Sequence, residues 1–336
     1  MHSRFVRTLL GALLAGTISN TNAIAAGNCD RACLRNLLDQ YLNAIVKHDP
    51  SGAPLMIGFR QTENALAVLP GEGVWKSITA LGKLQRRYLD SVNGSAGYYG
   101  TIVEGSETGI ATLRLQTDDR KITEAEWVIA RTNTGTPAGP GPGSTSAEAA
   151  ESTPPLDKPL PKEQRVPRSV MIAVTNSYFD SVQSGNTALM IAHPGWVRLE
   201  NGIGTGQGPG GARRGGAPGG GGARGTAGER GRGGRGAVAD DGQAAMCGGI
   251  CGVVARRYPI VDEEAGVVLG MVVFMRPPGS TNRRNLLTEW FAIDSGKIRG
   301  IYAAMHYLDP TIPAPNWPPY DGNWPLAPSL PGVNGR

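Results

Sequence analysis

Residues 34–46 read LRNLLDQYLNAIV, and residues 169–182 read SVMIAVTNSYFDSV. In both stretches apolar side chains recur every three or four positions, which is the pattern of an amphipathic helix. The first helix is expected to end near His48 and Asp49, just before Pro50, and the second near Gly185. Each half of the chain therefore opens with a helix that has one apolar face.

The two stretches belong to an internal repeat. Tyr41 and Tyr178 lie 137 positions apart, and the pairs Glu63-Asn64 and Glu200-Asn201 keep the same spacing. Alternating apolar residues then predict a hairpin in each half, followed by two further strands. The hairpins are expected at 97–103 with 110–115, and at 253–260 with 267–274.

A short second helix is expected after Gly73, because Trp75, Leu81, Leu84 and Tyr88 have helical spacing. The fold class that follows is α+β, with helices packed on one face of a curved antiparallel sheet and a concave pocket between them. Two such domains in tandem, produced by duplication, are the simplest account of the repeat.

Changes in composition give the domain boundaries. Among 336 residues there are 49 Gly and 25 Pro, and 18 of the 35 residues in 202–236 are Gly. Sequence of this kind cannot bury enough apolar surface to fold. The chain divides into a signal peptide (1–26), domain 1 (27–131), a Pro/Gly-rich linker (132–167), domain 2 (168–308) with a disordered Gly/Arg-rich insert (202–246), and a Pro/Trp-rich tail (309–336).

Residues 202–236 hold six Arg and a single acid, Glu229, and so account for the formal net charge of +5. The remainder is close to neutral, so the basic balance does not indicate nucleic-acid binding by a folded surface. The Arg-Gly repeats resemble segments that bind RNA. In an exported protein we expect a loop without a nucleic-acid partner, or a loose attachment to an anionic surface.

The first residues have the features of a secretory signal. Arg4 and Arg7 precede an apolar run at 9–18, and Ala23 and Ala25 supply the small residues before a cleavage point. That run is too short to span a bilayer, and no later segment reaches the length required. We therefore expect a protein that is secreted or periplasmic after cleavage, without a membrane span.

Four cysteines remain, spaced as Cys29/Cys33 and Cys247/Cys251. Helical spacing could suit zinc, but an oxidising compartment favours disulfides. Three connectivities are possible, and the sequence does not choose among them. No cluster of His and carboxylates predicts a metal site, and no nucleotide fingerprint is present, so we expect no metal and no cofactor.

Several short motifs carry a resemblance to a known family. They include CDRACL (29–34), HDPS (48–51), GEGVW (71–75), RLENG (198–202) and RYPIVDEE (257–264). They resemble an uncharacterised family of secreted tandem NTF2-like proteins of bacteria and fungi. The order of elements is similar to the NTF2-like superfamily, which includes SnoaL-like cyclases and ketosteroid isomerase. The resemblance implies two tandem cone-shaped domains.

Ketosteroid isomerase uses a carboxylate base, and its Tyr and a protonated carboxylic acid donate hydrogen bonds to an oxyanion. The resemblance places the Tyr at Tyr41 and Tyr178, and the acid at Glu289. The first half has no acid at the equivalent position, near Ala111. The basic Asp is replaced by Asn64 and Asn201, so Glu63 or Glu200 would have to act instead.

These comparisons favour domain 2 as the site. The candidate catalytic residues are Tyr178, Glu200, Glu289 and His306. The candidate substrate-binding residues are Arg198, Asn201, Trp290 and Tyr302. Secondary candidates in domain 1 are Tyr41, His48, Arg60, Glu63 and Asn64. His306 is included because strand alternation places it on one face with Tyr302 and Ala304, which we expect to be the pocket face.

Each candidate also has a structural interpretation. Glu200-Asn201 could form a turn with Arg198 paired to the Glu. Tyr178 could be a core tyrosine, and Glu289 could pair with Arg257 or Arg283. His48 could cap the first helix, where a positive charge favours the helix dipole.

The expected function is a cofactor-independent lyase or isomerase that acts on a small, largely apolar molecule in the pocket of domain 2. The alternatives are a non-catalytic protein that binds a small molecule in the same pocket, and an interaction scaffold with filled cones. The oligomeric state stays open, and the two domains are expected to pack as an intramolecular pseudo-dimer.

Overall fold

The computed structural model describes residues 29–132, 145–205, 250, 252–275 and 285–307. Two copies of one α+β unit follow each other along the chain. Domain 1 consists of α1 (Arg31–Val46), η1 (Pro50–Gly52), β1 (Leu55–Glu63), β2 (Leu66–Ala67), α2 (Val74–Ser77), β3 (Ala80–Asp90), β4 (Ser95–Glu104), β5 (Glu107–Asp118) and β6 (Lys121–Ala130).

Domain 2 repeats this order after a connecting segment. The connection holds α3 (Ala147–Ser152) and η2 (Lys162–Gln164). Domain 2 itself consists of α4 (Arg168–Ser184), η3 (Thr187–Leu189), β7 (Ala192–Glu200), β8 (Ile203–Gly204), β9 (Gly252–Asp262), β10 (Val267–Met275), β11 (Asn285–Asp294) and β12 (Lys297–Tyr307).

The two sheets have the same strand order. It is β2-β1-β6-β5-β4-β3 in domain 1 and β8-β7-β12-β11-β10-β9 in domain 2. All neighbours are antiparallel except β1 with β6 and β7 with β12, which are parallel. The expected α+β class with two tandem cone-like domains is thereby confirmed, with the refinement that each sheet is mixed.

The leading helices form where the apolar spacing predicts them. Asp30 caps α1 by accepting a hydrogen bond from the backbone N–H of Cys33 at 2.8 Å. A disulfide joins Cys29 to Cys33 across this first turn. Gly185 ends α4 in the left-handed conformation that glycine adopts without strain. Each helix packs its apolar face against one side of the sheet in its own domain.

The stretch 80–90 is a strand, so the expectation of a helix through Leu81, Leu84 and Tyr88 is wrong. Only residues 74–77 are helical. The register between β3 and β4 shifts between Leu81 and Gln85, which is a bulge. Leu81 packs in domain 1 and Leu84 and Tyr88 face domain 2, as strand alternation requires. Because both faces of β3 are covered, apolar residues occur on both, and their combined spacing resembles that of a helix.

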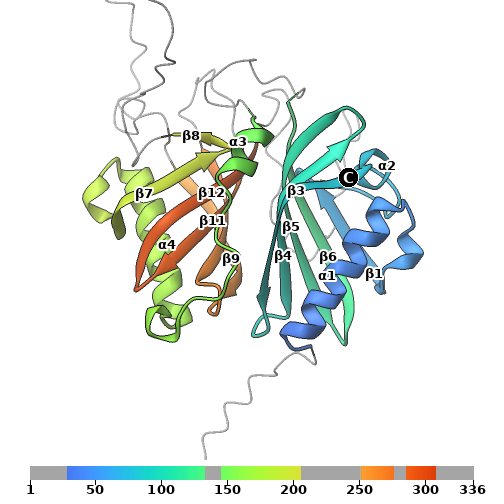
Figure 1. Cartoon of the computed structure of the whole chain (residues 1–336), viewed down its shortest axis with the longest axis horizontal. Helices are drawn as coiled ribbons and strands as arrows, with labels where there is room; N and C mark the ends of the chain where they lie inside the picture. Colours follow the sequence, from blue (N-terminus) through green and yellow to red (C-terminus); the bar gives the residue numbers. More distant parts are fainter. Residues whose placement is uncertain (1–28, 133–144, 206–249, 251, 276–284, 308–336) are drawn as a thin grey trace, which may run out of the picture.

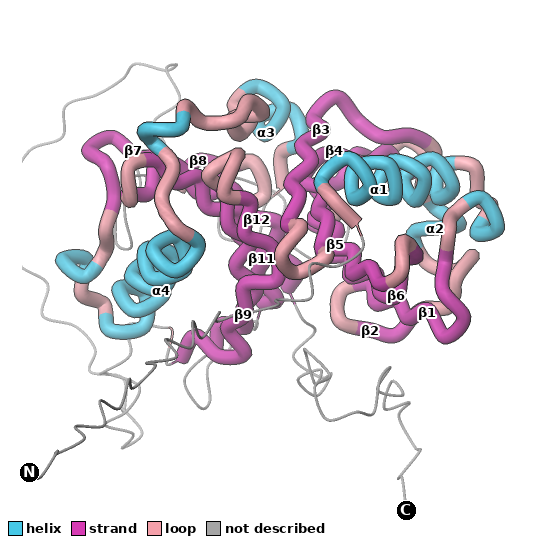
Figure 2. Tube along the Cα trace, turned by 90° about the horizontal axis from the view of Figure 1, so that it is seen from below, coloured by secondary structure: helices cyan, strands magenta, loops and turns pink. Residues whose placement is uncertain are grey.

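The two sheets face each other across the middle of the molecule, and α1 and α4 lie on the outer sides (Figures 1 and 2). Each domain has its own apolar core between helix and sheet, and a third apolar core lies between the two sheets. In it the Trp290 ring lies 4.8 Å from that of Tyr88, and the indole N–H donates to Thr112 Oγ1 at 2.9 Å. Gly97 has no side chain here, and any Cβ at this position would clash with Trp290.

Two buried aspartates join the domains reciprocally. Asp90 accepts a hydrogen bond from the backbone N–H of Val261 and pairs with Arg168, both at 2.8 Å. Asp262 accepts from the backbone N–H of Leu89 at 2.8 Å and pairs with Arg31 at 2.7 Å. Each aspartate ends an edge strand, and each arginine is the first residue of a leading helix.

The connection between the domains also crosses their junction. Ser146 donates its backbone N–H to Asn201 in domain 2, and Glu151 accepts from Thr101 in domain 1 at 2.7 Å. Further along, Arg86 donates to the carbonyl of Pro155 at 2.7 Å. Residues 145–167, expected as a linker, therefore pack on both domains.

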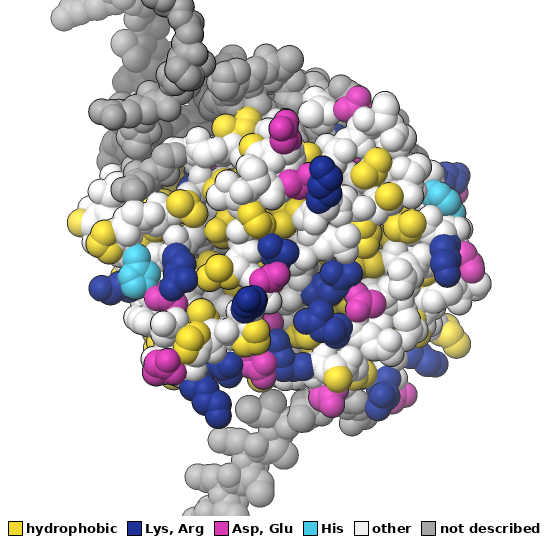
Figure 3. Space-filling view, viewed as in Figure 1, with side chains coloured by type: hydrophobic (Ala, Val, Ile, Leu, Met, Phe, Trp, Pro, Cys, Tyr) yellow, Lys and Arg dark blue, Asp and Glu magenta, His cyan; other side chains and the backbone are white. Residues whose placement is uncertain are grey.

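Several expectations lie outside the described residues. These are the signal peptide, residues 133–144 of the linker, residues 206–246 of the insert, the pair Cys247 and Cys251, and the tail. In the part of the chain that is described, no helix is both long enough and apolar enough to cross a membrane. Acidic and basic side chains are interspersed on the face shown in Figure 3.

The reciprocal contacts predict a cost for neutralising either aspartate. We expect Asp90→Asn and Asp262→Asn each to lower the free energy of unfolding by about 2 to 4 kcal/mol. Each substitution leaves the arginine at the domain junction without its carboxylate partner. Asp180→Asn is the matched control, since Asp180 is an exposed partner of Arg256 and should change stability by less than about 1 kcal/mol. Urea unfolding checks this, and equal effects of all three would contradict it.

Candidate functional site

A buried cluster of polar side chains lies inside domain 2. Tyr178 on α4 donates its hydroxyl to Glu289 Oε1 on β11 at 3.2 Å. Arg198 on β7 donates to the same oxygen through Nη2 at 3.2 Å, and its guanidinium lies 5.7 Å from the centroid of the Tyr178 ring. Arg198 Nη1 pairs with Glu200 and donates to Thr205 Oγ1. The structure thus brings together four of the predicted residues.

Glu289 is fully buried, with 0% of its surface exposed. Burial raises the pKa of this carboxyl, while Arg198 and Tyr178 act in the opposite direction without cancelling the effect of burial. Its second oxygen, Oε2, has no hydrogen-bond partner among the described residues, and neither does Arg198 Nε. A buried carboxyl with a raised pKa and one free oxygen can act as a proton donor or acceptor.

Apolar residues surround the cluster on the inner side of the sheet. Phe291 and Leu287 flank Glu289 on β11, and Ala303 lies opposite it on β12. The Tyr178 ring contacts that of Phe291 with centroids 5.3 Å apart. An apolar environment of this kind strengthens the electrostatic interactions of the few polar groups inside it.

Domain 1 has a different set of residues at the equivalent positions. Strand pairing aligns Leu113 with Glu289. Trp127 and Ala303 are equivalent because they lie opposite Glu63 and Glu200. Leu113 pairs with the first and Glu289 with the second. The spacing of 137 aligns Gln61 with Arg198. The first-half equivalent of Glu289 is therefore Leu113, two residues after Ala111, and it carries no acid, as expected.

The interior of domain 1 is uncharged and occupied by two indoles. Tyr41 and Trp75 both donate to Gln61 Oε1, at 2.8 and 2.7 Å. Trp127 donates to the Tyr41 hydroxyl at 3.2 Å. Tyr41 is therefore a hydrogen-bonded core tyrosine of this domain.

Glu63 has a structural position in domain 1. It accepts the backbone N–H of Val74 at 2.7 Å, at the start of α2, and pairs with Arg131 at 2.7 Å. Gly73 has a positive φ, and a Cβ at this position would clash with the Glu63 carboxylate. These contacts account for Glu63 without a ligand.

The Asn that follows each Glu forms a turn in both domains. Asn64 and Asn201 have positive φ, and their Oδ1 atoms accept backbone N–H groups of Ile129 and Met305 at 2.8 and 2.7 Å. Asn201 also donates to the carbonyl of Met305 at 3.1 Å. The placement of Asn201 in substrate binding is not supported by this geometry, because both polar groups of its side chain contact the backbone.

Arg60 and His48 do not reach the interior of domain 1. Arg60 pairs with Glu124, and its side chain is 40% exposed. The ring of His48 contacts the carbonyl of Trp75 just after α1. The repeat places Gln61, and not Arg60, at the position of Arg198, because Gln61 is 137 residues before it.

Three of the domain 2 candidates lie between the sheets, on the opposite face from Glu289. Trp290 and Tyr302 belong to the apolar core at the domain junction, and Tyr302 lies 6.4 Å from Tyr99 of domain 1. His306 is next to Arg131 of domain 1, and burial lowers its pKa to about 4. The expectation that this face of β12 lines the pocket is therefore wrong, because domain 1 covers it.

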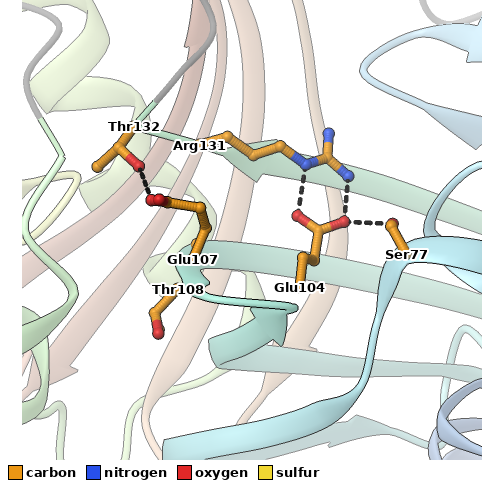
Figure 4. A pocket seen from close by; sticks show the side chains of 7 residues that line it. Ser77, Glu104, Glu107, Thr108, Arg131 and Thr132 are labelled. Atoms are coloured by element: carbon orange, nitrogen blue, oxygen red, sulfur yellow. Dashed lines mark hydrogen bonds and ion pairs between the residues drawn. The ribbon is translucent and has the colours of Figure 1, made fainter.

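A pocket of about 270 Å³ opens at the end of domain 1 where β4 turns into β5 (Figure 4). Its charged groups are already paired with one another. Arg131 contacts both oxygens of Glu104, at 2.5 and 2.9 Å, and Thr132 donates to Glu107 at 2.8 Å. In the described ranges, no group of three or more His, Cys, Asp or Glu side chains could hold a metal ion.

The sequence did not reveal Gln61, Trp127, Leu113 and Ala303 as interior positions. The shared spacing of 137 could have identified Gln61 as the partner of Arg198. The other three required the strand register, which the spacing of apolar residues does not give.

A family model described as Domain of unknown function (DUF8021) matches residues 164–305. The matched range begins at η2 and ends in β12, so it corresponds to domain 2. It includes Tyr178, Arg198, Glu200 and Glu289. No curated protein matches the chain.

The raised pKa of Glu289 predicts a pH-dependent stability difference. The raised pKa means that the folded state binds the proton of Glu289 more tightly than the unfolded state. In the unfolded state the pKa of a Glu is about 4.3. Ionising Glu289 therefore destabilises the fold as pH rises above that value. Glu289→Gln removes this dependence. Urea unfolding between pH 4 and pH 8 should show the variant gaining stability relative to the parent as pH rises. A difference that is constant with pH, or of opposite sign, would contradict it.

Proposed function

We propose that the protein is a secreted, cofactor-independent lyase or isomerase that performs acid–base chemistry on a small, largely apolar molecule inside domain 2. The observation that carries the proposal is the unpartnered Oε2 of Glu289. The carboxyl is fully buried, its other oxygen is held by Tyr178 and Arg198, and its pKa is raised. Such a group is prepared for proton transfer to a molecule in an apolar cavity.

The two carboxyls of domain 2 suit different roles. Protonated at Oε2, Glu289 donates a hydrogen bond to a substrate oxygen on which negative charge develops. Glu200 is more exposed than Glu289 and pairs with Arg198, so it is placed to exchange a proton between substrate carbon and solvent. Tyr178 and Arg198 position Glu289 through Oε1.

The equivalent residues of domain 1 support a scaffold role for that domain. Leu113 replaces the acid, and Trp127 stands where domain 2 has Ala303. Tyr41 and Trp75 both donate to Gln61 Oε1, so this neutral cluster has no acid and no base, although Gln61 Nε2 has no partner among the described residues. The matched strand orders and the leading helices also support membership of the NTF2-like superfamily, which is part of this proposal.

Turnover should depend on domain 2 alone. Proton NMR in D2O of the full chain with phenolic, polyketide-like and terpenoid ketones and alcohols is expected to show product formation or deuterium uptake beside a carbonyl. Glu289→Gln should slow this by at least about 100-fold. Tyr178→Phe should slow it by about tenfold because it removes only one of the contacts to Oε1.

Tyr41→Phe is the matched control, since it removes the equivalent hydroxyl from domain 1 and should leave the rate unchanged. Binding of a compound without turnover would favour a non-catalytic binding protein of the same fold. Turnover that survives Glu289→Gln, or that is lost in Tyr41→Phe, would contradict the assignment.

A further inference from the structure

We infer that the site in domain 2 selects uncharged molecules that present a hydroxyl group, and that Glu200 and Glu289 exclude carboxylates by occupying Arg198. This inference rests on the proposed function only in taking the interior of domain 2 as the ligand site. It names the class of ligand and the residues that determine it.

Arg198 lies between two carboxyl groups. Its Nη1 pairs with Glu200 and its Nη2 with Glu289, so one cation faces two carboxyls. If Glu289 is protonated the cluster is neutral, and if it is ionised the cluster is negative. In neither state is positive charge left to hold an anion. A ligand carboxylate would meet at least one like charge in surroundings of low dielectric constant, where repulsion is strong.

The unpartnered atoms define what the ligand must supply. Among the residues that the structure describes, Arg198 Nε–H has no acceptor and Glu289 Oε2 has no hydrogen-bond partner. Their side chains meet through Nη2 and Oε1 at 3.2 Å, so the two groups belong to one cluster. A hydroxyl group can accept from the first and donate to the second, or accept a proton from Oε2 when Glu289 is protonated. A carboxylate can only accept.

The neighbouring residues supply the apolar part of the recognition. Glu289 lies between Leu287 and Phe291 along β11, and Ala303 opposite it is small where domain 1 carries Trp127. A hydroxyl on an aromatic or aliphatic body fits this combination of one polar cluster and an apolar wall. In domain 1 the equivalent of Arg198 is the uncharged Gln61, whose Oε1 accepts two protein hydrogen bonds and whose Nε2 has no partner among the described residues.

The test compares matched pairs of probes that differ in charge. Saturation-transfer NMR at pH 7 with 2-naphthol against 2-naphthoate, and benzyl alcohol against benzoate, should show the alcohols binding the full chain at least about tenfold more tightly. Glu200→Gln releases Arg198 from one carboxylate and should shift the alcohol-to-carboxylate preference by at least about tenfold toward the carboxylate. Glu289→Gln should shift it less, because Glu289 protonated at Oε2 has no charge to remove.

Asp180→Asn is the charge-matched control, because it removes one negative charge from the exposed side of α4 and should not alter the preference. Glu200→Gln keeps the test valid if Glu289→Gln fails to fold, since Glu200 is less buried. Equal binding of both classes, binding of neither, or an unchanged preference in Glu200→Gln would overturn the inference. Recording deuterium uptake in the same samples separates the two proposals. Binding of alcohols without turnover would contradict the proposed enzyme activity and support the proposed selectivity. Turnover of carboxylates would support the activity and contradict the selectivity.

Discussion

The arrangement of the two domains depends on the reciprocal contacts of Asp90 and Asp262. Each carboxylate ends the edge strand of one sheet, accepts a backbone N–H from the other sheet, and pairs with an arginine at the start of a leading helix. A buried carboxylate requires such partners, because an unpaired charge there would be costly. The contacts hold the sheets face to face, and the face of β12 that carries Tyr302 and His306 is closed by domain 1.

The duplicated domains keep the residues that build the fold and differ in those that fill the interior. Asn64 and Asn201 form the same turn, and Tyr41 and Tyr178 occupy the same position on their helices. The polar partner of the Tyr differs, since Gln61 satisfies Tyr41 in domain 1 whereas Tyr178 contacts Glu289. Indoles surround the neutral pair and apolar side chains surround the charged one. A structural requirement would act on both domains alike, so the charged cluster of domain 2 points to a function specific to that domain.

Sequence periodicity predicted the two helices, the repeat and most strands, because each depends on local spacing of apolar residues. It failed at residues 80–90, where a strand buried on both faces has apolar residues at helical spacing. The strand register also places the equivalent of Glu289 at Leu113, two residues after Ala111. The sequence also identified Tyr178, Arg198, Glu200 and Glu289. It could not show that Trp290 and Tyr302 face the other domain, because alternation gives two faces of a strand without saying which one a neighbour covers.

The central claim is that a ligand enters domain 2 and not domain 1, and isoleucine methyl groups report on this directly. Ile298 and Ile301 lie in the inner core of domain 2 with Tyr178, and Ile45 and Ile129 lie in the inner core of domain 1 with Tyr41. Methyl NMR of the full chain labelled at isoleucine and titrated with 2-naphthol should therefore shift the signals of Ile298 and Ile301 and leave those of Ile45 and Ile129 unchanged. A shift of Ile45 and Ile129 with no change at Ile298 and Ile301 would contradict the account.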